Sequence, residues 1–180
     1  MKKLKYIVIP ILIAFVAFLS CEKDDICSDE TSTTARLFIE FYNSSNTENL
    51  KNVTKFRVQG VGNDDALSSY NVVTASSVYL PLKTTENTTQ FKLHNNYSIN
   101  DNGTPDDDSD DFPNGNEDII TISYNTKLEY VSKACGYKTV FENVTISVVD
   151  DGDKWINNIV STTDNEPISN EDEAHFYLFH

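Results

Sequence analysis

Residues 139–149 (TVFENVTISVV) decide the fold class of this chain. Apolar and polar residues largely alternate along them and β-branched side chains dominate, which is the pattern of a β-strand that buries one face. The inward candidates are Val140, Val144, Ile146 and Val148. The stretch that follows, residues 150–153 (DDGD), is a strong turn signal. We therefore expect residues 154–160 to form a strand that pairs back on the first.

Segments of the same kind recur outward from this stretch along most of the chain. They are residues 36–42, 53–61, 77–82, 90–94, 118–124, 127–132 and 174–179. Asn125 and Thr126 suit a tight hairpin between two of them, and Pro81 marks its segment as an edge strand or a strand end. About nine short strands with polar turns and no convincing amphipathic helix predict an all-β chain. We expect a single immunoglobulin-like β-sandwich.

The beginning of the chain has the order of a secretory signal. Three lysines within the first five residues precede an unbroken apolar run, residues 6–19, and Ser20 places a small residue directly before Cys21. That order indicates an export signal with a cleavage point. The run has fourteen residues, whereas a helix that crosses a bilayer needs about 20. We therefore expect residues 1–20 to be removed as a signal peptide.

Residues 18–21 (FLSC) resemble a bacterial lipobox, in which the cysteine sulfur is acylated before the signal is cut off, although Phe18 stands where Leu is usual. The resemblance implies that Cys21 carries acyl chains and holds the mature protein on the membrane; stable anchoring takes about two chains. Plain secretion with a structural Cys21 is the alternative. Residues 22–25 (EKDD) resemble the export tag of surface-exposed lipoproteins of the Bacteroidota. This resemblance implies the outer membrane and its outer face, with the periplasmic face as the alternative.

The remaining 160 residues are enough for one domain and scarcely for two. We expect a lipidated tether over residues 21–33 and the sandwich over residues 34–180. The whole chain has a net charge of −14, and the signal peptide removes three lysines and no acid, so the mature charge is −14 − 3 = −17. Such a surface repels phosphate backbones, and nucleic acid is therefore not an expected partner.

The chain has three cysteines. If Cys21 is acylated, Cys27 and Cys135 remain, and an exported location is oxidising. They allow one pairing within the chain, which would tie the end of the tether to a late strand. Two separate reduced thiols are the alternative.

Several short motifs occur together across the mature chain. They are residues 24–27 (DDIC), the strand with Phe41 and Tyr42, residues 80–82 (LPL), 132–137 (SKACGY) and 170–175 (NEDEAH). This set resembles a family of small uncharacterised lipoproteins from flavobacteria and other Bacteroidota, which is a domain of unknown function. The resemblance supports the pairing of Cys27 with Cys135, because both lie inside matching motifs, and it implies no activity. Residues 100–117 do not fit the family pattern.

That stretch, residues 100–117, is predicted to be an acidic loop, and residues 106–111 pack five carboxylates into six positions. Calcium binds several oxygen ligands at alternating positions, closed by a bidentate carboxylate. The candidate ligands are Asp106, Asp108, Asp110 and Glu117. Asp111 stands where such a loop normally has glycine, and the flanks read as strands rather than helices. The alternative is a solvated charge run between strands.

We identify no catalytic constellation in the sequence. Three histidines are too few and too differently placed for a zinc site, and neither a nucleophile elbow nor a phosphate-binding glycine loop is present. The abundant aromatic side chains could line a sugar-binding face, but at strand positions they more often pack in the core. The leading hypothesis is a non-catalytic structural or binding accessory with no cofactor. The alternative is a calcium-dependent carbohydrate-binding surface module.

Overall fold

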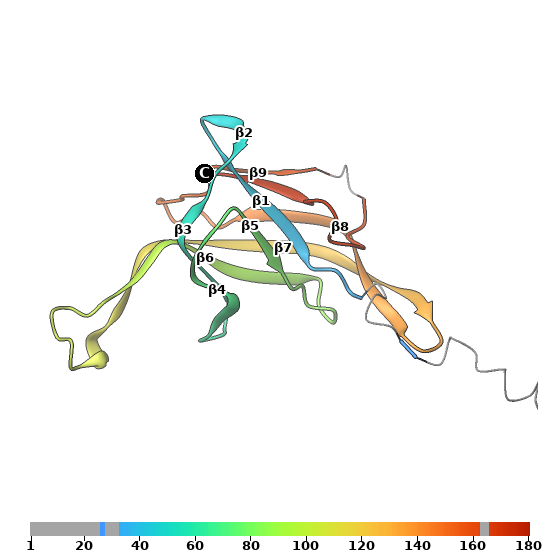
Figure 1. Ribbon diagram of the computed structural model, residues 1–180, viewed down its shortest axis with the longest axis horizontal. Coiled ribbons are helices and arrows are strands. Elements are labelled where there is room, and N and C mark those ends of the chain that lie inside the picture. Colours follow the sequence, from blue (N-terminus) through green and yellow to red (C-terminus); the bar gives the residue numbers. More distant parts are fainter. Residues whose placement is uncertain (1–25, 28–32, 163–165) are drawn as a thin grey trace, which may run out of the picture.

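The computed structural model describes residues 26–27, 33–162 and 166–180 (Figure 1). The predicted signal peptide, Cys21 and most of the predicted tether lie outside the described residues. Within the described part of the chain, ten strands form two five-stranded sheets, and no helix is long and apolar enough to cross a membrane. The prediction of an all-β sandwich is confirmed.

The first sheet is built around β1, and it brings the first and last described strands of the chain together. It contains β1 (Leu37–Asn43), β2 (Asn46–Leu50), β5 (Ser77–Leu80), β9 (Asn158–Ser161) and β10 (Phe176–Phe179). β1 pairs in parallel with β10 and antiparallel with β2 and β5, and β10 continues to β9. β5 pairs with β1 alone among the described strands and ends just before Pro81, which lacks the N–H that a further ladder bond would need.

The second sheet is antiparallel throughout, and its strands are longer. Its order is β4–β3–β6–β7–β8, with β3 (Val53–Gly60), β4 (Ala66–Ala75), β6 (Thr88–Asn100), β7 (Phe112–Ser132) and β8 (Gly136–Val148). Alternation places every second side chain of these strands on the inner face. Leu93, Ile120 and Ile122 are fully buried there and meet Leu37, Ile39 and Phe41 of the first sheet.

β7 is one strand of 21 residues, and the predicted hairpin at Asn125 and Thr126 is wrong. Both residues lie inside the β7–β8 ladder, where Asn125 pairs with Glu142 and Thr126 with Phe141. A shift of register in β8 accompanies a positive φ of 54° at Asn143. Such a bulge kinks and twists the ladder without ending it. The real turn follows Ser132, where the next strand begins with a glycine at a φ of +71°.

The DDGD stretch is not a hairpin either, because it carries the chain from one sheet to the other. β9 begins only at Asn158 and pairs with β10. The residues before it, Trp155 and Ile156, are buried between the sheets. The indole N–H of Trp155 donates to the Leu93 carbonyl (3.0 Å), and the Ile156 N–H donates to the carboxyl of Asp118 (2.8 Å). Burial of two large side chains therefore replaces the pairing that the turn signal predicted.

Asp118 is a fully buried acid beside the segment that connects the two sheets. One of its oxygens accepts from Ile156, and the other has no hydrogen-bond partner among the described residues. Burial raises the pKa of Asp118, because the charged form loses its hydration.

Two long hairpins project from opposite ends of the domain, and β7 belongs to both (Figure 1). The β6–β7 hairpin ends in the acidic stretch, and the β7–β8 hairpin ends in the turn at Cys135. β6 extends to Asn100 and β7 begins at Phe112, so the loop between the strands covers residues 101–111 rather than the predicted 100–117. The two hairpin tips therefore differ in chemistry: one carries the acidic loop, and the other carries Cys135.

Candidate functional site

A disulfide joins Cys27 to Cys135, as the sequence predicted, with a Cα–Cα distance of 4.9 Å across 108 positions of sequence. Cys135 lies in the turn of the β7–β8 hairpin, where its N–H donates to the hydroxyl of Ser132 (3.0 Å). The bridge therefore attaches the end of the tether to the tip of this hairpin. Cys21, the predicted lipidation site, lies outside the described residues.

The chain from Thr34 to Arg36 is fixed to the domain by contacts with late segments. The Thr139 N–H donates to the hydroxyl of Thr34 (2.9 Å). The backbone N–H and the guanidinium Nε of Arg36 both donate to one carboxylate oxygen of Glu171 (2.8 and 2.9 Å). The Arg36 guanidinium also lies 4.7 Å from the ring centroid of Tyr79. Hydrogen bonds from Arg36 lower the pKa of Glu171, and this pair holds the first strand to the segment before β10.

His175 completes this attachment. Its Nδ1 accepts from the Phe38 N–H (2.9 Å), which leaves Nε2 to donate to the Asn170 carbonyl (3.1 Å). Burial lowers the pKa of His175, so the ring is held neutral with both nitrogens hydrogen-bonded. The NEDEAH motif therefore binds the residue before β1 through Glu171 and β1 itself through His175. The sequence contained this motif, but nothing in its residue types indicated the partner strand.

A pocket of about 300 Å³ lies beside this motif. Its lining contains three acidic side chains, Glu166, Asp172 and Glu173, and one edge of His175. Because both ring nitrogens of His175 are already bonded, the pocket has carboxylates but no available imidazole. It can attract cations, and it does not combine an acid with a base.

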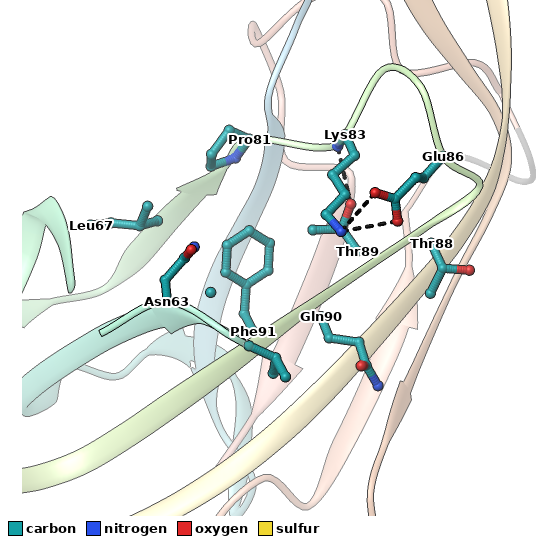
Figure 2. A pocket seen from close by; sticks show the side chains of 11 residues that line it. Asn63, Leu67, Pro81, Lys83, Glu86, Thr88, Thr89, Gln90 and Phe91 are labelled. Carbon is teal, nitrogen blue, oxygen red and sulfur yellow. Dashed lines mark hydrogen bonds and ion pairs between the residues drawn. The ribbon is translucent and has the colours of Figure 1, made fainter. Parts of the chain in front are cut away.

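A second pocket, of about 290 Å³, opens where β3, β5 and β6 end or begin (Figure 2). Figure 2 shows Pro81 and Phe91 on one side and the ion pair of Lys83 with Glu86 on the other. The Lys83 ammonium lies 2.9 Å from the nearer Glu86 oxygen. The charged groups of this pocket thus neutralise each other, and the pocket offers a small, mixed apolar and polar surface.

A polar cluster covers the outer face of the second sheet. Phe91 and Leu93 point into the core, so the alternating positions Lys92 and His94 point outward. Glu117 of β7 lies opposite His94, with carboxylate oxygens 3.1 Å from the Lys92 ammonium and 3.1 Å from His94 Nε2. His94 is nevertheless buried, and burial lowers its pKa. Strand alternation gives this ring an outward position, and nothing in the sequence indicates that it is buried there.

The structure separates the predicted calcium ligands. Asp106, Asp108 and Asp110 lie in the loop or its short 3₁₀ turn, whereas Glu117 lies within β7 against Lys92. Asp110 accepts hydrogen bonds from Asn102 and Thr104 (3.0 and 2.8 Å), so its carboxylate serves the internal structure of the loop. Across the described ranges, no group of three or more His, Cys, Asp or Glu side chains is arranged to hold a metal ion. Calcium binding stays a prediction from the sequence.

Taken together, the fold and these contacts define a disulfide-bonded β-sandwich whose two terminal strands are held side by side. Residues 55–180 match the family described as "Family of unknown function (DUF6452)", and the chain belongs to this family. The match contains Cys135, Glu171 and His175 and begins after Cys27. No curated protein and no solved structure matches the chain.

Proposed function

We propose that this protein is a lipoprotein held on the outer membrane by acyl chains on Cys21, and that its sandwich acts as a non-catalytic structural or binding accessory on the cell surface. The export signal of residues 1–20, the lipobox-like FLSC and the EKDD stretch after it support this proposal. The acyl chains supply the membrane attachment, and no other membrane device is required.

The observation that carries the proposal is the disulfide between Cys27 and Cys135. Structural disulfides form and persist in exported proteins and are rare in the reducing cytosol. The bridge also lies six residues after Cys21, at the far end of a short acidic tether. Two independent features, the export signal and the oxidised cysteine pair, therefore both support an exported location.

The proposal of a non-catalytic role is supported by the state of the reactive side chains. Both nitrogens of His175 are bonded to backbone groups. Lys83 is paired with Glu86, and Glu117 with Lys92. General acid–base chemistry needs a titratable group that faces a substrate, whereas these groups face each other or the backbone. Their contacts rigidify the domain, which suits a scaffold or a binding surface.

Metabolic labelling with radioactive palmitate tests the anchor. We expect the wild-type chain to incorporate label and the Cys21→Ala variant to lose it. The Cys27→Ala/Cys135→Ala variant is the matched control, because it removes the other two cysteines and should still be labelled. Label that persists in Cys21→Ala would refute the anchor.

Protease treatment of intact cells then distinguishes the two faces of the outer membrane. Digestion of the wild type supports the cell surface, and protection indicates the periplasmic face.

A further inference from the structure

The tip of the β7–β8 hairpin exposes a cluster of large apolar side chains. Tyr130 and Tyr137 face each other across the hairpin with ring centroids 5.5 Å apart, and they are 59% and 66% exposed. Leu128, two residues before Tyr130, is 69% exposed. Residues two apart in a strand share a face, so these three side chains form one surface, which we call the tip face. Ile26, next to the disulfide, is 83% exposed at the same end of the domain.

The tip face continues the core-facing side of the sheet. Thr126 pairs with the fully buried Phe141, and cross-strand partners lie on the same face. Thr126, Leu128 and Tyr130 follow at intervals of two along β7. The side that packs in the core at Phe141 therefore runs on past the end of the sandwich, where the described residues place no opposing strand over Leu128 and Tyr130. Such an exposed apolar surface is typical of a contact with a partner or a membrane.

The tether limits how far this surface can lie from the membrane. Cys21 and Cys27 are 27 − 21 = 6 residues apart, and an extended chain spans at most about 3.5 Å per residue, so the acylated sulfur lies within about 20 Å of the disulfide. Tyr137 is only two residues after Cys135. A surface confined so close to a bilayer meets it at a high effective concentration, and weak affinity suffices for contact.

The charges of the two hairpins favour the same orientation. Residues 126–139 carry three lysines and one acid, whereas residues 100–117 carry seven acids and no base. Residues 22–30, which the disulfide attaches to the first end, add five acids and one lysine, so anionic lipid headgroups repel the second end more strongly than the first. Tyrosine is enriched at membrane interfaces, because its ring is apolar and its hydroxyl is polar. The tip face therefore matches a membrane interface in its chemistry.

We infer that the tip face, formed by Leu128, Tyr130 and Tyr137, rests on the interfacial layer of the bilayer in which the acyl chains of Cys21 are inserted, so that the acidic hairpin points away from the membrane. This inference rests on the proposed lipid anchor. The lipidated cysteine fixes the distance of the domain from the membrane, and the tip face fixes its orientation.

The test uses the full-length lipidated protein with a single added cysteine that carries an environment-sensitive fluorophore. Leu128→Cys reports on the tip face. Ile99→Cys is the matched control, because Ile99 is another exposed aliphatic residue, 53% exposed, on the opposite hairpin. Both are placed in vesicles of phosphatidylethanolamine and phosphatidylglycerol that contain a spin-labelled lipid as quencher. We expect the label at position 128 to be quenched by the lipid and to gain fluorescence several-fold, and the label at position 99 to remain accessible to iodide.

A second variant tests whether the side chains of the tip face, and not the label itself, bring position 128 into the membrane. Tyr130→Ser/Tyr137→Ser in the Leu128→Cys background should still float with the vesicles and should lose most of the quenching. If the labelled protein floats but position 128 is no more quenched than position 99, the orientation is refuted while the anchor stands. If the protein does not float, the anchor is refuted and the orientation with it. Shielding of position 128 from iodide before vesicles are added would indicate a second copy of the chain on this face and would also refute the inference.

Discussion

The two long hairpins share β7 but end in opposite ways. At the β7–β8 tip, a covalent bridge ties the turn to the beginning of the domain, and residues 126–139 combine large apolar side chains with three lysines and one acid. At the β6–β7 tip, residues 101–111 are held by local hydrogen bonds, such as those of Asp110 and Asp107, and the side chains are acidic. Because β7 extends beyond the core at both of its ends, it contributes to two tips of different chemistry. Only the β7–β8 tip is covalently tied to the rest of the domain.

The largest expected effect comes from the covalent bridge. Cys27→Ser/Cys135→Ser should lower the free energy of unfolding by about 4 kcal/mol, because the bridge closes a loop of more than a hundred residues in the unfolded chain. Denaturant unfolding of the mature domain measures the loss. Reduction of the wild-type protein is the control and should give the same midpoint as the variant. Equal midpoints for the oxidised wild type and the variant would contradict the structural role of the bridge.

The next effect lies at the base of the acidic hairpin, where Gly115 has a φ of +108°. A Cβ there would stand 2.7 Å from the Asn95 carbonyl oxygen and 2.8 Å from that of Asn96. Gly115→Ala should therefore cost about 2–3 kcal/mol, from strain and from displacement of backbone.

Gly103→Ala, in the acidic loop itself, is the matched control for Gly115→Ala. Gly103 also has a positive φ, of +80°, but a Cβ there meets nothing within 4 Å. Only the conformational cost of about 1 kcal/mol should remain. Equal costs at the two glycines, measured by denaturant unfolding, would show that the close packing at Gly115 has no influence on stability.

A smaller effect should appear as a dependence of stability on pH. Burial lowers the pKa of His94, His175 and His180, so the unfolded chain takes up protons at these sites at a higher pH than the folded chain. Stability should therefore be fully present above about pH 6.5 and should fall as the pH is lowered, by at most about 1.4 kcal/mol per pH unit for each histidine. The His175→Gln variant has one titrating histidine fewer, so its loss of stability per pH unit should be smaller by the contribution of that histidine.

Asp118 gives the control for the pH experiment, because its contribution has the opposite sign. Its raised pKa means that the folded state holds its proton more tightly, so its contribution is full at low pH and is lost as the pH rises through the folded pKa. Asp118→Asn should remove this opposing trend and steepen the observed loss on acidification. A stability that does not change between pH 7.5 and pH 5 in both the wild type and Asp118→Asn would contradict the neutral state of the buried histidines.

The sequence predicted most of the fold, and its failures share one cause. Alternation placed Val144, Ile146 and Val148 correctly against the core, and the cysteine count led to the disulfide. The predicted turn at Asn125 and the predicted hairpin after DDGD are local signals that tertiary contacts overrode. Asn125 lies in a ladder that the neighbouring strand extends, and Trp155 after DDGD is drawn into the core.

The candidate site was harder to predict, because its contacts join segments that are distant in sequence. Arg36 and Glu171 are 135 positions apart, and Phe38 and His175 are 137 apart. A charge or a histidine in a strand-rich sequence has many potential partners, and nothing local selects one of them. The predicted calcium ligands illustrate the same difficulty: spacing groups Glu117 with the loop, whereas strand pairing places it opposite His94.

The smallest effect on stability is expected at the acidic tip, and it decides whether that tip has a ligand. Asp106→Asn/Asp108→Asn should change the free energy of unfolding by less than about 0.5 kcal/mol, because both side chains are exposed and lie outside the strands. The same pair of proteins tests the calcium prediction. If the loop binds calcium, millimolar calcium should raise the melting temperature of the wild type and not that of the variant. An unchanged melting temperature for both, together with no heat in calorimetry, would leave the acidic tip as a solvated charge run that keeps this end of the domain away from anionic surfaces.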